Sequence, residues 1–163
     1  MTATSRRTTT GHLVARAAAA ALCVAVAYIH VKDQGGLTVL KDPAYMGVGY
    51  WALEATALAV AAMLLTRIRP LATWFFAIGV AAGPLVGFIL TRTTGLPNAM
   101  DDRGNWTETL GVESLIVEGA LLVLATALFF RSRGASKADP YVAGLPVQSV
   151  ASPQTRSSVP AGR

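Results

Sequence analysis

TRTTGLPNAMDDRGNWTETLGVESLIVEG, residues 91–119, is the stretch that decides the fold. It leaves one apolar segment through Arg92, crosses a loop rich in Gly, Pro, Asn and Asp, and enters a second apolar segment that carries Glu113 and Glu118. The string TGLP is typical of a helix end that is followed by a turn. The stretch therefore predicts two helices joined by a polar loop, with charged side chains close to the joined ends.

The other apolar residues of the chain also gather in blocks. Hydrophobic residues make up 53% of the 163 residues and charged residues only 14%, which is too apolar for a soluble domain of this size. The blocks are roughly 20 residues long, the length that crosses about 30 Å of hydrocarbon. The predicted fold is all-α, a four-transmembrane-helix bundle in a lipid bilayer, with helices at about 12–31, 44–66, 71–91 and 110–130.

Two polar segments flank this predicted transmembrane domain of residues 12–131. Residues 1–11 are small, polar and basic, and residues 132–163 are rich in Ser, Pro, Ala and Gly without a core-forming pattern. Such segments bury too little apolar surface to offset the entropy cost of ordering them. Both are therefore predicted to be disordered tails.

The beginning of the chain also resembles a signal peptide. Arg6 and Arg7 precede an apolar stretch, and residues 25–27 are small enough for a cleavage site. Against cleavage, Arg16 interrupts the stretch and the apolar run continues to Ile29. The pattern favours a retained helix, and cleavage stays open as the alternative.

The positions of Lys and Arg predict the orientation in the membrane. Ten of the 14 lie before the middle of the first segment, in the turn at residues 67–69 and in the C-terminal tail. The other four lie in or beside the two longer loops, together with five acidic residues. By the positive-inside rule both termini are predicted to be cytoplasmic, which agrees with an even number of spans. The expected location is the cell inner (plasma) membrane.

This topology brings five ionisable side chains to one level, in the outer half of the predicted bundle: His30, Glu54, Arg92, Glu113 and Glu118. A charge at membrane depth costs roughly 2.5–3.5 kcal/mol, so such groups are expected to face the interior and find partners. Arg92 presents a planar fork that suits a carboxylate. Its expected partner is Glu54, Glu113 or Glu118, and the choice among them stays open.

Each of these groups also has a purely structural interpretation. Arg92 with an acidic partner is a structural clamp, and Glu54 is an interior acid without chemistry. His30 is an interfacial histidine, with a metal or proton-relay role as the alternative. His30, Glu54 and Glu118 are weak candidates for metal ligands because no local spacing such as HExxH supports a site. No catalytic residue, metal or cofactor is therefore predicted.

Three further features have simple interpretations. The outer-loop acids Asp101, Asp102 and Glu108 are expected to be solvated. The glycines of the third segment, at positions 79, 83 and 87, suit close approach of another helix. Cys23 is the only cysteine, which excludes an intramolecular disulfide and a thiolate zinc site.

The string TRTTGLP, the short acidic loop with Trp106 and the following ETLGVESLIVEG carry a resemblance. They look like an uncharacterised family of actinobacterial-type four-helix integral membrane proteins whose third helix ends in a (S/T)RTxGLP motif. Thr91 stands where that family usually has Ser. The likeness covers about residues 12–130 and implies the fold and a membrane location, without catalytic residues. A looser similarity to DoxX-like proteins, some linked to quinone or redox partners, is only architectural.

These observations predict a small integral membrane protein that acts as a non-enzymatic accessory, binding or sensing component. A small ligand, an ion, another membrane protein or a second copy of the chain would engage its polar residues. The alternative is a small ion- or proton-coupled transporter, and a quinone-linked membrane oxidoreductase is less favoured. Nucleic acid is not an expected partner, because the basic residues flank apolar blocks without aromatic interleaving.

Overall fold

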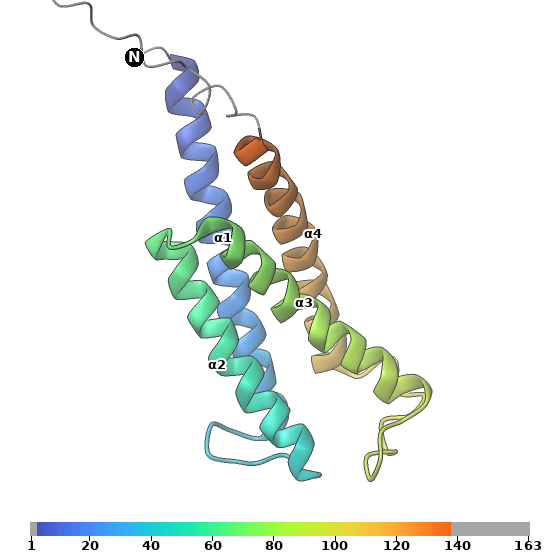
Figure 1. The fold of residues 1–163 in the computed structure, drawn as a ribbon. Coiled ribbons are helices and arrows are strands. Elements are labelled where there is room, and N and C mark those ends of the chain that lie inside the picture. The colour runs from blue at the N-terminus through green and yellow to red at the C-terminus, as the bar shows by residue number, and fades with distance from the viewer. Residues whose placement is uncertain (1–2, 138–163) are drawn as a thin grey trace, which may run out of the picture.

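The computed structural model describes residues 3–137 and forms four helices, α1 (Ala3–Gln34), α2 (Ala44–Thr66), α3 (Pro70–Thr93) and α4 (Thr109–Lys137) (Figure 1). Each helix contains a stretch that is long and apolar enough to cross a membrane: Gly11–Gln34, Ala44–Thr66, Pro70–Thr93 and Thr109–Gly134. The predicted all-α, four-helix fold is confirmed. The four stretches indicate a multi-pass membrane protein.

Two of the helices extend beyond their predicted bounds. α1 begins at Ala3, so residues 3–11, expected to be disordered, are helical. The segment contains no proline, and once a helix exists each added residue gains a hydrogen bond without a new nucleation cost. α4 likewise continues to Lys137, into the segment predicted as the C-terminal tail. The rest of that tail, residues 138–163, lies outside the described residues, as do residues 1–2.

The helices pack as two antiparallel hairpins. α1 packs along α2 and α3 along α4, while α1 also contacts α4. α2 and α3 follow each other through the short turn at residues 67–69 but share less contact, and Figure 1 shows them spreading apart away from that turn. The bundle is therefore open between the hairpins at the end that carries the loops 35–43 and 94–108. We call this the loop end and the opposite end the terminal end.

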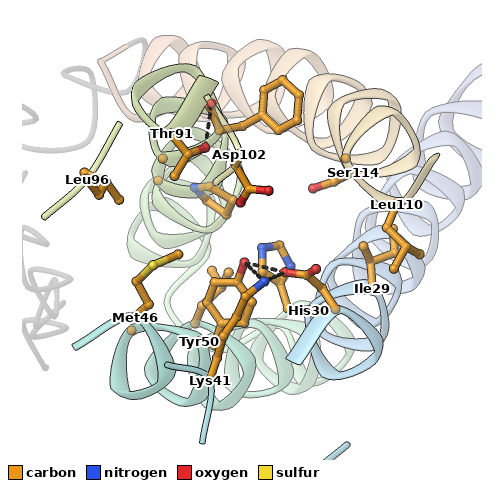
Figure 2. A pocket seen from close by; sticks show the side chains of 18 of the residues that line it. Ile29, His30, Lys41, Met46, Tyr50, Thr91, Leu96, Asp102, Leu110 and Ser114 are labelled. Atoms are coloured by element: carbon orange, nitrogen blue, oxygen red, sulfur yellow. Dashed lines mark hydrogen bonds and ion pairs between the residues drawn. The ribbon is translucent and has the colours of Figure 1, made fainter. Parts of the chain in front are cut away.

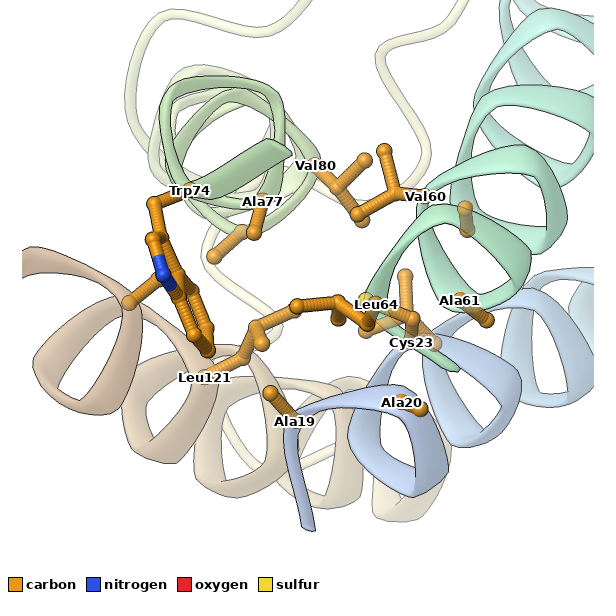
Figure 3. Close-up of a cluster of buried hydrophobic side chains, with 14 of the residues drawn as sticks. Ala19, Ala20, Cys23, Val60, Ala61, Leu64, Trp74, Ala77, Val80 and Leu121 are labelled. Carbon is orange, nitrogen blue, oxygen red and sulfur yellow. The ribbon is translucent and has the colours of Figure 1, made fainter. Parts of the chain in front are cut away.

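Towards the terminal end the bundle is filled by an apolar core built mostly from small side chains (Figure 3). Alanines of all four helices and Cys23 lie fully buried beside Leu64, Trp74 and Leu121. Small residues let helix backbones approach closely, which supplies the van der Waals contact that holds helices together in lipid. Below the loop end the helices are thus closed by apolar packing.

Arg16, the charge that interrupts the first apolar run, has a structural role at the end of α2. Its Nε donates to the carbonyl of Leu64 at 2.8 Å and its Nη2 to that of Met63 at 3.3 Å. The last carbonyls of a helix lack partners within the helix, and a cation there also complements the helix dipole. Arg16 therefore caps α2 from the neighbouring helix.

Candidate functional site

A cavity of about 400 Å³ lies at the loop end, between the two hairpins (Figure 2). All four helices and both long loops contribute to its walls. Its apolar walls come from Ile29, Met46, Leu53, Pro84, Phe88, Leu96 and Leu110. Its polar walls come from His30, Asp33, Lys41, Tyr45, Tyr50, Thr91, Arg92, Asp102, Glu108 and Ser114. The cavity thus combines an apolar lining with charged groups held near its loops.

The first hairpin supplies an ion pair reinforced by a phenol. Lys41 Nζ and the Tyr50 hydroxyl both donate to Asp33 Oδ2, each at 2.5 Å. The Lys41 ammonium also lies 5.0 Å from the centre of the Tyr50 ring, within the range of a cation–π contact. This wall is therefore electrically paired within its own hairpin.

Glycine makes that wall possible. A Cβ on Gly47 would lie 2.7 Å from both the backbone nitrogen and the backbone oxygen of Lys41. The loop before α2 can press against the first turn of the helix only because no side chain stands there. Gly35 and Gly36, at φ 94° and 132°, turn the chain just after α1. The loop thereby places Lys41 beside Asp33.

The second hairpin holds Arg92, only 6% exposed, against its own loop. Arg92 Nε donates to the Asn105 carbonyl at 2.7 Å, and Nη1 donates to Thr91 Oγ1 at 3.1 Å. Nη1 lies 3.0 Å from Asp102 Oδ2, and Nη2 is hydrogen-bonded to the carboxylate of Glu108. Groups of residues 91–108 thus occupy all three guanidinium nitrogens.

The predicted partners of Arg92 are therefore wrong. Neither Glu54, Glu113 nor Glu118 contacts it, whereas Asp102 and Glu108, expected to be solvated, do. The loop folds back over the end of α3, where the Gly104 amide donates to the Arg92 carbonyl at 2.9 Å. This fold-back places Asp102 and Glu108 against the arginine, so that they occupy the positions where a carboxylate of another helix would otherwise pair with it.

The two glutamates of α4 lie on different faces of the helix. Glu113 is exposed and takes no part in the site, while Glu118 is 1% exposed. Five residues along a helix rotate a side chain to about 140° from its starting direction, so one of the two must face away. Glu118 accepts a hydrogen bond from Ser114, which lies on the cavity wall one turn towards the loop end.

His30 of α1 lies on the side of the cavity where α1 packs against α4, and we call this side the deep end. Its Nδ1 lies 2.9 Å from the carbonyl oxygen of Val26, and its Nε2 lies 3.9 Å from Glu118 Oε1. A carbonyl only accepts hydrogen bonds, so Nδ1 carries the hydrogen and Nε2 of the neutral ring is an acceptor. The edge of the ring packs against Tyr50, with centroids 5.0 Å apart. Figure 2 shows His30 and Ser114 on different walls of the cavity.

Glu54 lies apart from this arrangement. It is 7% exposed, does not line the cavity and has Gln34 of α1 as its polar neighbour. Within the described part of the chain, neither Glu54 Oε1 nor the amide atoms of Gln34 have a partner at hydrogen-bond geometry. The predicted five-residue cluster thus reduces to His30 and Arg92 on the wall and Glu118 behind Ser114.

The glycines of α3 do not pack against another helix. A Cβ on Gly79, Gly83 or Gly87 would meet no described atom within 4 Å. Gly83 and Gly87 line the cavity, on the side where α2 and α3 spread apart, and Gly79 does not. Close approach of another helix of the same chain at this stripe, as predicted, does not occur among the described residues. Two of the three glycines instead leave room for the cavity.

No metal centre is formed by the residues that the structure describes. Among them, no three His, Cys, Asp or Glu side chains converge as a group able to hold a metal ion. The weak candidates His30 and Glu118 do meet, but Glu54 does not join them. Cys23 is buried in the apolar core.

The predicted site residues left out eight polar residues of the cavity wall: Asp33, Lys41, Tyr45, Tyr50, Thr91, Asp102, Glu108 and Ser114. The charged residues among them lie in or next to loops, where charges are normally solvated. A signal was present, since each loop acid stands within reach of a basic residue of its own hairpin. Comparison with protein-family models, curated proteins and solved structures gives no match. The resemblance based on the TRTTGLP string therefore stays a prediction.

Proposed function

We propose that this protein is a non-enzymatic binding or sensing component of the membrane that holds a small ligand in the loop-end cavity. The observation that carries the proposal is the cavity itself. Its volume of about 400 Å³ lies in the range of roughly 300–1,000 Å³ typical of small-molecule sites. Its walls combine apolar side chains with a few convergent polar groups, as in such sites.

The ion pairs of the walls support a preformed site. Lys41 is paired with Asp33, and Arg92 with Asp102 and Glu108, so neither cation needs a ligand for compensation. A site whose polar groups are already held in place loses less entropy on binding. The walls therefore orient a ligand without having to rearrange around it.

We further propose that the loop end faces the exterior of the cell, with both termini in the cytoplasm of a plasma membrane. The basis is the excess of Lys and Arg at the terminal end. A ligand then arrives from outside or from the outer leaflet. A partner membrane protein, or a second copy of the chain, would bind at this face when the cavity holds its ligand.

An ion- or proton-coupled transporter is the second candidate. It is favoured by the buried Glu118 and Glu54, each with a carboxylate oxygen that lacks a partner among the described residues. The apolar core opposes it, because the described helices are closed there by side chains such as Leu64, Trp74 and Leu121. Proton uptake by sealed proteoliposomes, abolished in Glu118→Gln, would favour the transporter over the binding component.

The binding proposal is tested by filling the cavity. Gly87→Leu places a side chain into the cavity, whereas Gly79→Leu adds the same side chain to the same helix outside it. Native mass spectrometry of the purified protein should detect a bound small molecule in the wild type and in Gly79→Leu, and none in Gly87→Leu. The same bound species in both variants would refute the cavity as the site.

A further inference from the structure

The deep end of the loop-end cavity has hydrogen-bond acceptors without donors. His30 donates its Nδ1 hydrogen to the Val26 carbonyl, which leaves Nε2 as an acceptor. Ser114 donates its hydroxyl hydrogen to Glu118 Oε1. Glu118 Oε2 is buried and has no partner within residues 3–137. A buried polar atom without a partner is costly, so this region lacks a donor that the described chain does not supply.

The spacing between His30 Nε2 and the nearer oxygen of the Glu118 carboxylate, Oε1, which also accepts from Ser114, limits what the donor can be. Nε2 of His30 and Oε1 of Glu118 are 3.9 Å apart, too far for a direct hydrogen bond. A single donor atom that carries two hydrogens can form a hydrogen bond to each of these two acceptors. With two bonds of about 2.8 Å, acceptors 3.9 Å apart subtend an angle of about 90° at that atom. A water oxygen or an amine nitrogen meets this requirement.

Charge separates these two possibilities. The cavity wall carries two cations, Lys41 and Arg92, against three carboxylates, Asp33, Asp102 and Glu108. Glu118 adds a further carboxylate behind the deep end, and no described Lys or Arg is paired with it. A carboxylate buried away from water either takes up a proton or is stabilised by a compensating charge. A positively charged donor beside the Glu118 carboxylate brings both hydrogens for these acceptors and a compensating charge.

We infer that the cavity binds a small primary amine in its ammonium form. Its nitrogen lies between His30 Nε2 and the Glu118 carboxylate, and its apolar part lies along Leu53 and Pro84 of the cavity wall. The inference rests on the proposed function and names its ligand class. A quaternary ammonium cannot replace the amine because it has no N–H. A neutral alcohol cannot replace it because it brings no charge.

Three probes of one skeleton test the inference: benzylamine, benzyltrimethylammonium and benzyl alcohol. Benzylamine has a charge and N–H donors, benzyltrimethylammonium has a charge but no N–H, and benzyl alcohol has an O–H donor but no charge. Isothermal titration of the full chain in lipid nanodiscs should show benzylamine binding about tenfold or more tighter than the other two, since a charged hydrogen bond contributes about 1.5–3 kcal/mol. Equal affinity for benzyl alcohol, or no binding of benzylamine, would overturn the inference.

Variants of α4 provide a matched pair. Glu118→Gln removes the buried carboxylate with little change of shape, and Glu113→Gln removes the exposed one on the same helix. Benzylamine affinity should fall about tenfold or more in the first and stay unchanged in the second. His30→Phe keeps the ring but removes the acceptor, and it should also weaken binding. Undiminished benzylamine binding by Glu118→Gln would overturn the inference, because the amine would then bind without the Glu118 carboxylate.

Failure of this inference is distinguishable from failure of the proposed function. A bound species that Gly87→Leu removes, but that contains no amine, would retain the cavity as a binding site and exclude the ammonium ligand. A cavity that Gly87→Leu does not affect would exclude both.

Discussion

Replacing Arg92 by Met should destabilise the protein by about 3 kcal/mol. The guanidinium is 6% exposed, while the side chains of its partners Glu108 and Asp102 are 33% and 39% exposed. Breaking a fully buried pair costs about 3–5 kcal/mol and losing an exposed pair about 0–1 kcal/mol. The mixed exposure places the ionic loss near 2 kcal/mol, and the stranded Asn105 carbonyl adds about 1 kcal/mol.

SDS titration of the protein in mixed micelles measures this loss as a change in unfolding free energy. Arg103→Met is the matched control, because exposed Arg103 donates from Nε to the Thr93 carbonyl at 3.0 Å within the same loop. It should cost no more than about 0.5 kcal/mol. Arg92→Met combined with Glu108→Gln should be milder than Arg92→Met alone, because one stranded carboxylate is removed. Equal losses for Arg92 and Arg103, or simple additivity in the double variant, would refute this account.

Two further predictions concern packing and topology. Gly47→Ala should destabilise the protein by about 1–3 kcal/mol through its clash with the backbone of Lys41, while Gly49→Ala, with no atom within 4 Å of its Cβ, should be neutral or slightly stabilising in the same SDS titration. In a background without the native cysteine, a membrane-impermeant maleimide should label Asn98→Cys on intact cells and Ile68→Cys only after permeabilisation. The reverse labelling would contradict the proposed orientation.

The helices were predictable because hydrophobic length is a local property. The segment 44–66 was predicted with the bounds that α2 has, and the third segment differs from α3 by only one or two residues at each end. The outer ends of α1 and α4 differ from the prediction because polar composition does not by itself prevent a helix. A helix already formed in the membrane extends into adjoining residues that contain no proline.

The level of the site residues along the bundle was predictable from the sequence, but their contact partners were not. Counting residues brought His30, Arg92 and Glu118 to the loop end, where the structure has them buried. The same counting grouped them with Glu113, which faces away from the bundle, and with Glu54, which does not line the cavity. Depth depends on rise per residue, whereas contact also depends on how each helix is rotated about its axis.

The sequence by itself determined that four apolar helices form, and roughly how deep each charge lies, because both depend on residue order within one segment. Only the tertiary structure decided that Arg92 pairs with Asp102 and Glu108. That choice depends on a loop in which Gly95, Asn98 and Gly104 adopt positive φ and turn the chain back over α3. The cavity likewise arises only from the divergence of α2 and α3. Relations between segments depend on packing free energies summed over the whole bundle, which no local pattern records.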